Sequence, residues 1–213
     1  MAVAQHTAAS RTAAYLAAPL WAAQALVWTI APKVQEQTAP YRITDAPLFE
    51  LFWLSVAAAV GLSAVASLAI PAYLGTRPSR LVRTGSVLSR VAVGLACVAA
   101  LSAAVAPFST LQQPALTIMT NALYGAILLL AIGLTSFAVA GRANGRPHDV
   151  GGRLPTVLAV LTVVTIAAIL ASGTSSVAGL YLAVAIVVLD GVAWFAWGNA
   201  LGGTRPRPVA APA

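Results

Sequence analysis

Residues 47–74 decide the fold class, and they read PLFELFWLSVAAAVGLSAVASLAIPAYL. A single carboxylate, Glu50, stands near the head of this stretch, and residues 51–74 carry no charge. A helix over residues 47–74 is about 42 Å long, whereas the apolar core of a bilayer is roughly 30 Å thick. The stretch therefore predicts a transmembrane helix that tilts, or that projects from the bilayer at one end.

The rest of the chain has the same character. Of its 213 residues, 60% are hydrophobic and 8% are charged, whereas soluble domains average about 25% charged residues. We therefore expect an all-α membrane protein, a compact bundle of about six transmembrane helices built as one domain over residues 1–203, with a flexible Pro-rich tail over residues 204–213. The predicted spans cover residues 13–31, 47–74, 87–106, 115–140, 154–172 and 178–201.

The basic residues predict the orientation of these spans. Ten of the twelve lysines and arginines lie in the N-terminal segment, in or beside the second and fourth loops, and in the tail, while the first loop holds the other two. Positive residues favour the cytoplasmic side, so both termini are predicted to be cytoplasmic. The same distribution indicates a multi-pass protein of the inner (plasma) membrane, with the lipid bilayer as its partner and no nucleic acid.

Several kinds of chemistry have no basis in the sequence. It contains no Gly-rich phosphate loop, no Cys/His cluster with metal-site spacing, and no Asp-rich motif that would hold magnesium against a diphosphate. Both histidines, His6 and His148, lie outside the predicted spans. We therefore expect no metal and no cofactor, and any chemistry falls to acids and aromatic residues.

Two acids lie in or beside apolar sequence, where carboxylates are costly and usually functional. Glu50 has Phe49, Phe52 and Trp53 around it. It is either an interfacial carboxylate that reaches headgroup water or an acid inside a cavity, and the sequence leaves both open. Asp45, just before Pro47, is expected to cap the helix.

Asp190 stands roughly in the middle of the last span and cannot easily reach either interface. It is therefore expected to face the bundle interior, either in a functional site or in a structural hydrogen bond to a neighbouring helix. Trp194 and Trp197 follow at i+4 and i+7, on the same helical face.

Other polar and aromatic residues are candidates for binding a substrate. In the first span, Trp21, Gln24 and Trp28 recur at helical spacing, which also suits an aromatic belt with one polar interhelix contact. In the fourth span, Asn121 and Tyr124 share a face.

Two segments resemble the integral-membrane terpene cyclases of meroterpenoid and indole-terpenoid pathways, and in particular their bacterial members. Phe49-Glu50-Leu51-Phe52-Trp53 is similar to the family's glutamate near the start of its second span, and Leu189-Asp190-Gly191-Val192-Ala193-Trp194 to its aspartate in the last span. The fungal members have seven spans, whereas six are counted here. The resemblance implies a metal-independent, protonation-initiated cyclisation of a prenylated, most simply farnesylated, hydrophobic small molecule.

In that reading Asp190 is the proton donor, because the more buried carboxyl is held neutral more readily. Glu50 orients the donor or takes the final proton, and the two roles are exchangeable. The substrate-binding set then comprises Trp21, Gln24, Trp28, Phe49, Trp53, Asn121, Tyr124, Trp194 and Trp197.

Two alternatives come from other classes of protein. A small proton- or cation-coupled transporter, or a transporter-associated subunit, would use Asp190 as an ion site and would have helices broken near the membrane midplane. A non-enzymatic membrane scaffold would use both acids only to hold helices together.

Overall fold

The computed structural model is a helical bundle with one pair of two-residue strands. It describes residues 2–28, 35–36, 42–43, 45–75, 79–108, 112–143, 150–171 and 177–203. The helices are α1 (Ala2–Trp28), α2 (Ala46–Ser67), α3 (Ile70–Leu74), α4 (Arg80–Val105), α5 (Gln112–Ala143), α6 (Val150–Ala171) and α7 (Val177–Gly203), with a 3-10 turn at Ala106–Phe108. The strands β1 (Gln35–Glu36) and β2 (Arg42–Ile43) pair antiparallel within the predicted first loop.

Each predicted span overlaps one long helix, which confirms the all-helical architecture. Within the described residues, four helical stretches are long and apolar enough to cross a membrane, and Arg153–Thr165 is a shorter apolar stretch. The four are Ala46–Leu74, Arg80–Phe108, Gln112–Ala143 and Val184–Gly202.

Two helices differ in extent from the predicted spans. α1 begins at Ala2 rather than at residue 13, because its first turns are rich in alanine, the best helix former, although they are not continuously apolar. The predicted single helix over residues 47–74 is interrupted at Leu68 and Ala69. Pro71 explains the interruption, because proline has no N–H to donate to the carbonyl four residues earlier and its ring clashes with that carbonyl.

Asp45 caps α2 as predicted. Its side-chain Oδ1 accepts a hydrogen bond of 3.1 Å from the backbone N–H of Leu48, and Pro47 lies in the first turn, where a missing N–H costs nothing. The cap fixes where α2 starts, and hence the position of Glu50 one turn further on.

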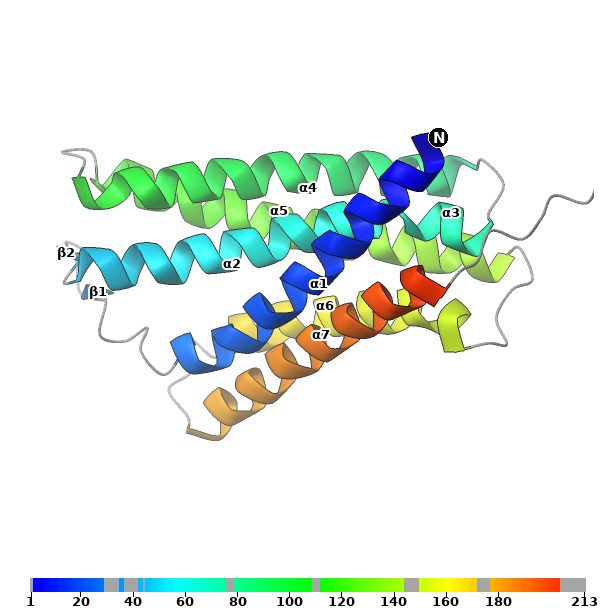
Figure 1. Ribbon diagram of the computed structural model, residues 1–213. Helices are drawn as coiled ribbons and strands as arrows, with labels where there is room; N and C mark the ends of the chain where they lie inside the picture. Colours follow the sequence, from blue (N-terminus) through cyan, green and yellow to red (C-terminus); the bar gives the residue numbers. More distant parts are fainter. Residues whose placement is uncertain are drawn as a thin grey trace, which may run out of the picture.

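The six long helices form a closed ring. In order around it, α1 packs against α2, α2 against α4, α4 against α5, α5 against α6, α6 against α7, and α7 against α1. α2 and α5 also touch each other across the ring. Successive long helices alternate in direction, so the start of α1 and the end of α7 lie at the same end of the bundle, opposite β1 and β2 (Figure 1).

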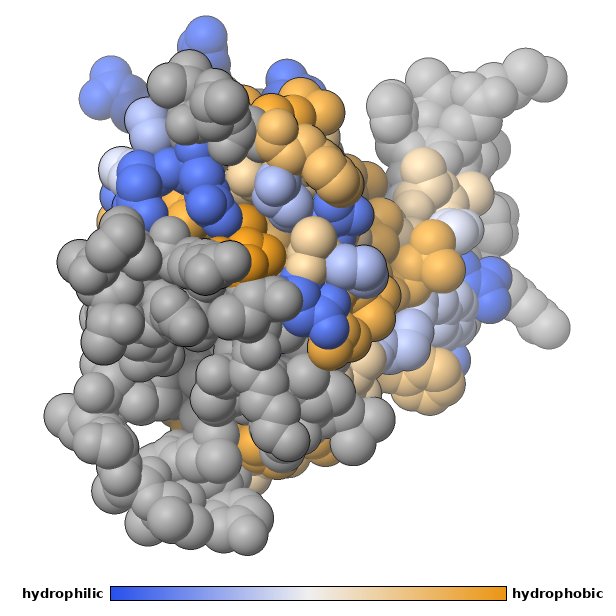
Figure 2. All heavy atoms as spheres, turned by 90° about the vertical axis from the view of Figure 1, so that its left-hand side faces the viewer, coloured by the Kyte–Doolittle hydropathy of each residue, from blue (hydrophilic) through white to orange (hydrophobic). Residues whose placement is uncertain are grey.

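The outer surface of the ring is apolar. Large hydrophobic side chains are exposed on the long helices, and apolar groups reach the described surface in Figure 2. Water-exposed patches of this kind are avoided by soluble monomers and mark contact with a membrane or a partner. Examples are Leu101 on α4, Leu128 and Ile132 on α5, Val160 on α6, and Val192 and Phe195 on α7.

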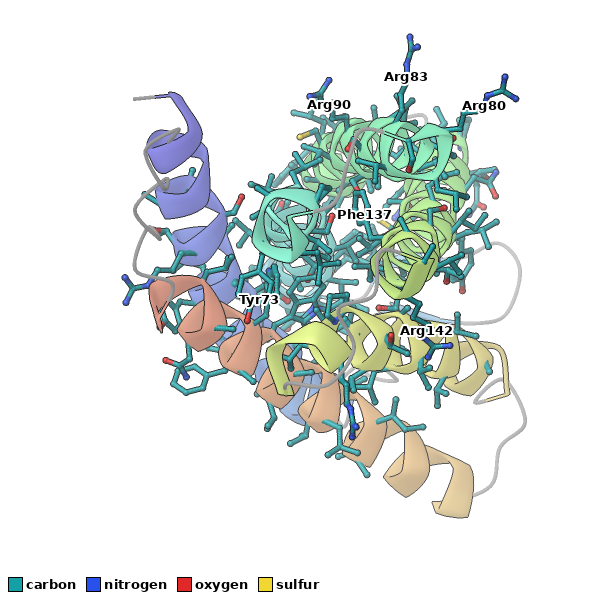
Figure 3. All side chains as sticks on the ribbon, turned by 90° about the vertical axis from the view of Figure 1, so that its right-hand side faces the viewer. Tyr73, Arg80, Arg83, Arg90, Phe137 and Arg142 are labelled. Atoms are coloured by element: carbon teal, nitrogen blue, oxygen red, sulfur yellow. The ribbon has the colours of Figure 1, made fainter. Side chains whose placement is uncertain are left out.

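Small residues let neighbouring helices approach closely, as their abundance in the sequence predicts. A Cβ added to Gly85 of α4 would lie 2.6 Å from the ring of Phe137, whose side chain points into the bundle from α5 (Figure 3). A Cβ on Gly191 of α7 would lie 2.7 Å from the carbonyl oxygen of Ala18 in α1. The second contact brings α1 directly against the residue that follows Asp190.

Candidate functional site around Asp190

Asp190 lies near the middle of α7, and only 1% of its surface is exposed. Its Oδ2 accepts a 3.3 Å hydrogen bond from Oγ1 of Thr165 in α6. Its Oδ1 is buried and has no hydrogen-bond partner among the described residues. The carboxyl is therefore anchored to α6 through Oδ2, while Oδ1 is buried without a hydrogen bond of ordinary geometry.

Trp194 and Trp197 share the buried face of α7 with Asp190, as their spacing predicts. The indole N–H of Trp194 lies beside the carboxyl of Asp190 and interacts with it, although the contact falls outside strict hydrogen-bond geometry. Trp197 is held more firmly, because its N–H donates to the carbonyl of Ala66 in α2 at 3.1 Å and its ring meets that of Tyr73 edge-on at 5.0 Å. One indole is thus held by a hydrogen bond to α2, and the other lies beside the carboxyl of Asp190.

α1 supplies the side of this region next to α2. Trp21 donates from Nε1 to Oγ of Ser63 at 2.9 Å, and Gln24 donates from Nε2 to Oγ of Ser55 at 2.8 Å. Oε1 of Gln24 is buried and has no partner in the described part of the chain. The predicted polar contact between helices is therefore present for both residues, while the side chain of Trp28 lies outside the described side chains.

Glu50 belongs to a different group of contacts, at the start of α2. It is half-buried, and its Oε1 is a buried atom without a hydrogen-bond partner among the described residues. Phe49 is fully buried and packs with Ala103, Ala106 and Met119. The ring of Trp53 lies 4.7 Å from that of Phe52, edge-on, and its N–H also lacks a described partner.

The described contacts do not bring Glu50 and Asp190 together. Ser55 and Ser63 mark the side of α2 that faces α1, and at 3.6 residues per turn Glu50 lies about 140° around the helix from each of them. Asp190, by contrast, contacts α6 and lies next to the seam between α1 and α7. The side chain that hydrogen-bonds to Asp190 is Thr165 of α6 and not Glu50.

Asn121 and Tyr124 lie outside the interior site. Both are on the exposed side of α5, with 46% of Tyr124 accessible, and they share that side with Leu128 and Ile132. Their i, i+3 spacing correctly predicts a common face, but it carries no information on whether that face points inward. Their role in binding a substrate stays a prediction, and the structure places them apart from the buried residues around Asp190.

Five buried side-chain atoms have no hydrogen-bond partner in the part of the chain that the structure describes, and all belong to residues singled out from the sequence. Buried polar groups are almost always satisfied, by protein atoms or by ordered water, so each of these atoms requires an explanation. They are Oε1 of Gln24, Oε1 of Glu50, Nε1 of Trp53, Oδ1 of Asp190 and Nε1 of Trp194.

Sequence reasoning missed Thr165, Ser55 and Ser63, which hold the site residues in place. Small hydroxyl residues are frequent in apolar helices and usually bond to their own helix, as Thr162 does with the carbonyl of Leu158. Only the neighbour across the interface distinguishes Thr165 from Thr162. Among the described residues, no three His, Cys, Asp or Glu side chains cluster as metal ligands would.

The structure thus defines an apolar helical bundle with a buried carboxyl, that of Asp190, in its interior. A scan against protein-family models found no match, and comparisons with curated proteins and with solved structures found none either.

Proposed function

We propose that this chain is a six-span protein of the inner membrane of a bacterium, with the start of α1 and the end of α7 on the cytoplasmic side. Four apolar helices and an apolar outer surface support insertion. Exposed arginines lie at the end of the bundle where α1 starts and α7 ends (Figure 3), and positive residues favour the cytoplasmic face. They include Arg11, Arg80, Arg83, Arg142 and Arg153.

Within this bundle, Asp190 acts as the proton donor of a metal-independent terpene cyclase that takes a prenylated, most simply farnesylated, small molecule. One observation carries the proposal: a fully buried carboxyl anchored through Oδ2 with its Oδ1 unbonded, on the same helical face as two buried indoles. The resemblance of the segments around Glu50 and Asp190 to membrane terpene cyclases points to the same reaction.

The chemistry follows from this arrangement. The hydroxyl of Thr165 occupies Oδ2, so the acidic proton resides on Oδ1. Transfer of that proton to one carbon of a substrate double bond leaves a carbocation on the other carbon and a carboxylate on Asp190. Aromatic faces attract cations, so Trp194 and Trp197 stabilise the charge while the ring closes. Loss of a proton to a base then forms the product.

Of its two predicted roles, we assign Glu50 that of accepting the final proton. Thr165 already orients the donor, whereas the unbonded Oε1 of Glu50 is free to accept the final proton. The aromatic residues Phe49, Phe52 and Trp53 contact one another next to it in the sequence and make its surroundings on α2 largely apolar.

Transport is the weaker alternative, because α7 runs through Asp190 as one continuous helix. The interruption of α2 lies at its end, roughly 33 Å from the start of the helix, and not near the midplane.

The test is Asp190→Asn, assayed with a panel of farnesylated aromatic compounds. We expect product formation to fall by at least about 100-fold, the usual contribution of a general acid. Asp45→Asn is the matched control, since asparagine caps a helix as well as aspartate does, and it should retain activity. Thermal unfolding in detergent checks that both variants fold.

An Asp190→Asn variant that folds and still cyclises these substrates would refute the proposal. Proton flux in liposomes that requires Asp190, in a wild-type protein that forms no cyclic product, would establish transport instead.

A further inference from the structure

The outward face of α4 combines positive charge with an apolar track. α4 is the least buried of the four apolar stretches. Of its apolar 18-residue segment, 28% is buried, against 50–56% for the other three stretches. Residues on one of its faces recur at helical spacing and are exposed or unobstructed. In order along the helix they are Arg83, Val87, Arg90, Gly94, Val98, Leu101 and Val105.

The arginines on this face have no acidic partner in the described part of the chain. Arg80, Arg83 and Arg90 are exposed and make no ion pair, and Figure 3 shows all three pointing away from the bundle. The described acids lie elsewhere, either at the opposite end of the bundle, as Glu50 does, or in its interior, as Asp190 does. Within the described residues, these three guanidinium groups therefore have no counter-charge.

The helix geometry directs two of these charges to one level. Arg90 lies about 10 Å along the axis from Arg83, because each residue rises 1.5 Å. Helical side chains lean toward the N-terminus, and a long arginine extends back toward the membrane surface when its stem lies in apolar surroundings. Val87 and Val91, both nearly half exposed, provide those surroundings. In a bilayer, the Arg90 guanidinium is therefore expected to extend back toward the headgroup layer at the level of Arg83.

The apolar part of the track continues from that point. A Cβ added at Gly94 would meet nothing within 4 Å. Because glycine has no side chain, the helix surface forms a shallow depression there, one turn beyond Arg90. Val98 and Leu101 follow on the same face, with 68% of Leu101 exposed. A row of unpaired guanidinium groups followed by an apolar track matches a phosphate headgroup followed by an acyl chain.

We propose that this face, which we call the α4 lipid face (Arg80, Arg83, Arg90, Gly94, Val98 and Leu101), binds an anionic phospholipid. Arg83 and Arg90 hold the phosphate, Arg80 adds charge beside it, and an acyl chain lies over Gly94 along Val98 and Leu101. Guanidinium groups bind phosphate through paired hydrogen bonds, and basic residues at the cytoplasmic surface favour anionic lipids. The assignment is independent of the reaction at Asp190.

The experiment titrates the purified full chain in detergent with phosphatidylglycerol and follows lipid adducts by native mass spectrometry. The double variant Arg83→Gln/Arg90→Gln should lower the apparent affinity roughly tenfold or more, since each arginine contributes about 1 kcal/mol at a charged surface. Arg142→Gln, which removes an exposed arginine from α5 at the same end, is the matched control and should bind as the wild type does.

Two further arms separate the sources of binding. Phosphatidylcholine, which has no net charge, and inorganic phosphate, which has no acyl chain, should both bind more weakly than phosphatidylglycerol. Gly94→Leu, which fills the low point of the track without altering any charge, should also weaken binding. Equal binding of phosphatidylglycerol by the wild type and the arginine double variant, or equal binding of phosphatidylcholine and phosphatidylglycerol by the wild type, would overturn the proposal.

Discussion

The hydroxyl of Thr165 donates the hydrogen bond that links the buried carboxyl of Asp190 to α6. Thr162, one turn earlier in α6, is equally buried but bonds only to the carbonyl of Leu158 in its own helix. Two chemically identical residues on one helix thus have different roles, because only one of them faces α7. This pair allows the site to be tested at the level of a single hydroxyl group.

Replacing Thr165 with valine keeps the shape of the side chain and removes the donor. We expect a loss of stability of about 1 kcal/mol, together with a change in the pH profile of product formation, because the acidic proton is no longer restricted to Oδ1. Thr162→Val should leave the pH profile unchanged. Measuring both profiles decides the matter, and identical profiles for the two variants would remove Thr165 from the mechanism.

A second prediction concerns Glu50, whose carboxyl lies apart from Asp190 in the described contacts. Glu50 is the proposed base that takes the final proton. Glu50→Gln should therefore lower product formation and shift the products toward those formed when water captures the cation. Chromatography of the products measures this, with Asp45→Asn again as the control. A Glu50→Gln variant with wild-type rate and products would exclude Glu50 from the reaction.

At the scale of helices, the seam between α1 and α7 depends on glycine. Added carbon at Gly191 would meet backbone atoms of α1, which cannot rotate away as a side chain can. Gly198 and Gly202 continue the same seam, against the ring of Tyr15 and the guanidinium of Arg11. These close contacts hold α7, and with it Asp190, at a fixed depth beside Trp21.

Two Gly→Ala substitutions test this seam. Gly191→Ala should destabilise the protein by about 1–3 kcal/mol through overpacking. Gly94→Ala on α4 meets no atom within 4 Å and should stabilise it by up to about 1 kcal/mol, since alanine favours helix more than glycine does. Thermal unfolding in detergent measures both changes, and equal midpoints would show that the α1–α7 contact is loose.

At the scale of the whole molecule, the ring of alternating helices places the start of α1 and the start of α4 at one end and the 3-10 turn Ala106–Phe108 at the other (Figure 1). In a membrane, this arrangement places the two ends on opposite faces. The arginine distribution predicts which face is cytoplasmic.

Single cysteines at Ala8, Ser79 and Phe108, in a protein whose exposed Cys97 is replaced by alanine, test this topology. A membrane-impermeant maleimide added to intact spheroplasts should label the Phe108 position only, and all three after lysis. Labelling of positions 8 and 108 from the same side would require a different number of crossings.

How much was predictable differs between the fold and the site. The number of long helices follows from apolar run lengths near 20 residues, because a helix must satisfy its own backbone hydrogen bonds in an apolar medium. The break before Ile70 was missed because hydropathy reports no backbone geometry, although Pro71 carried the signal. Asn121 and Tyr124 share a face as predicted, but spacing does not define the direction of that face, and the structure shows it to be exposed.

Residues 47–74 by themselves determine an apolar helix with one acid near its capped start, because length, hydropathy and the Asp45 cap are properties of local sequence. Only the tertiary structure decided which neighbours each acid meets. Around α2, the serines that contact α1 lie on one side and Glu50 on another, so Glu50 joins the group around Phe49 and Trp53 while Asp190 bonds to Thr165. Contacts between distant segments depend on helix rotation and close packing across the ring, and no local pattern encodes these.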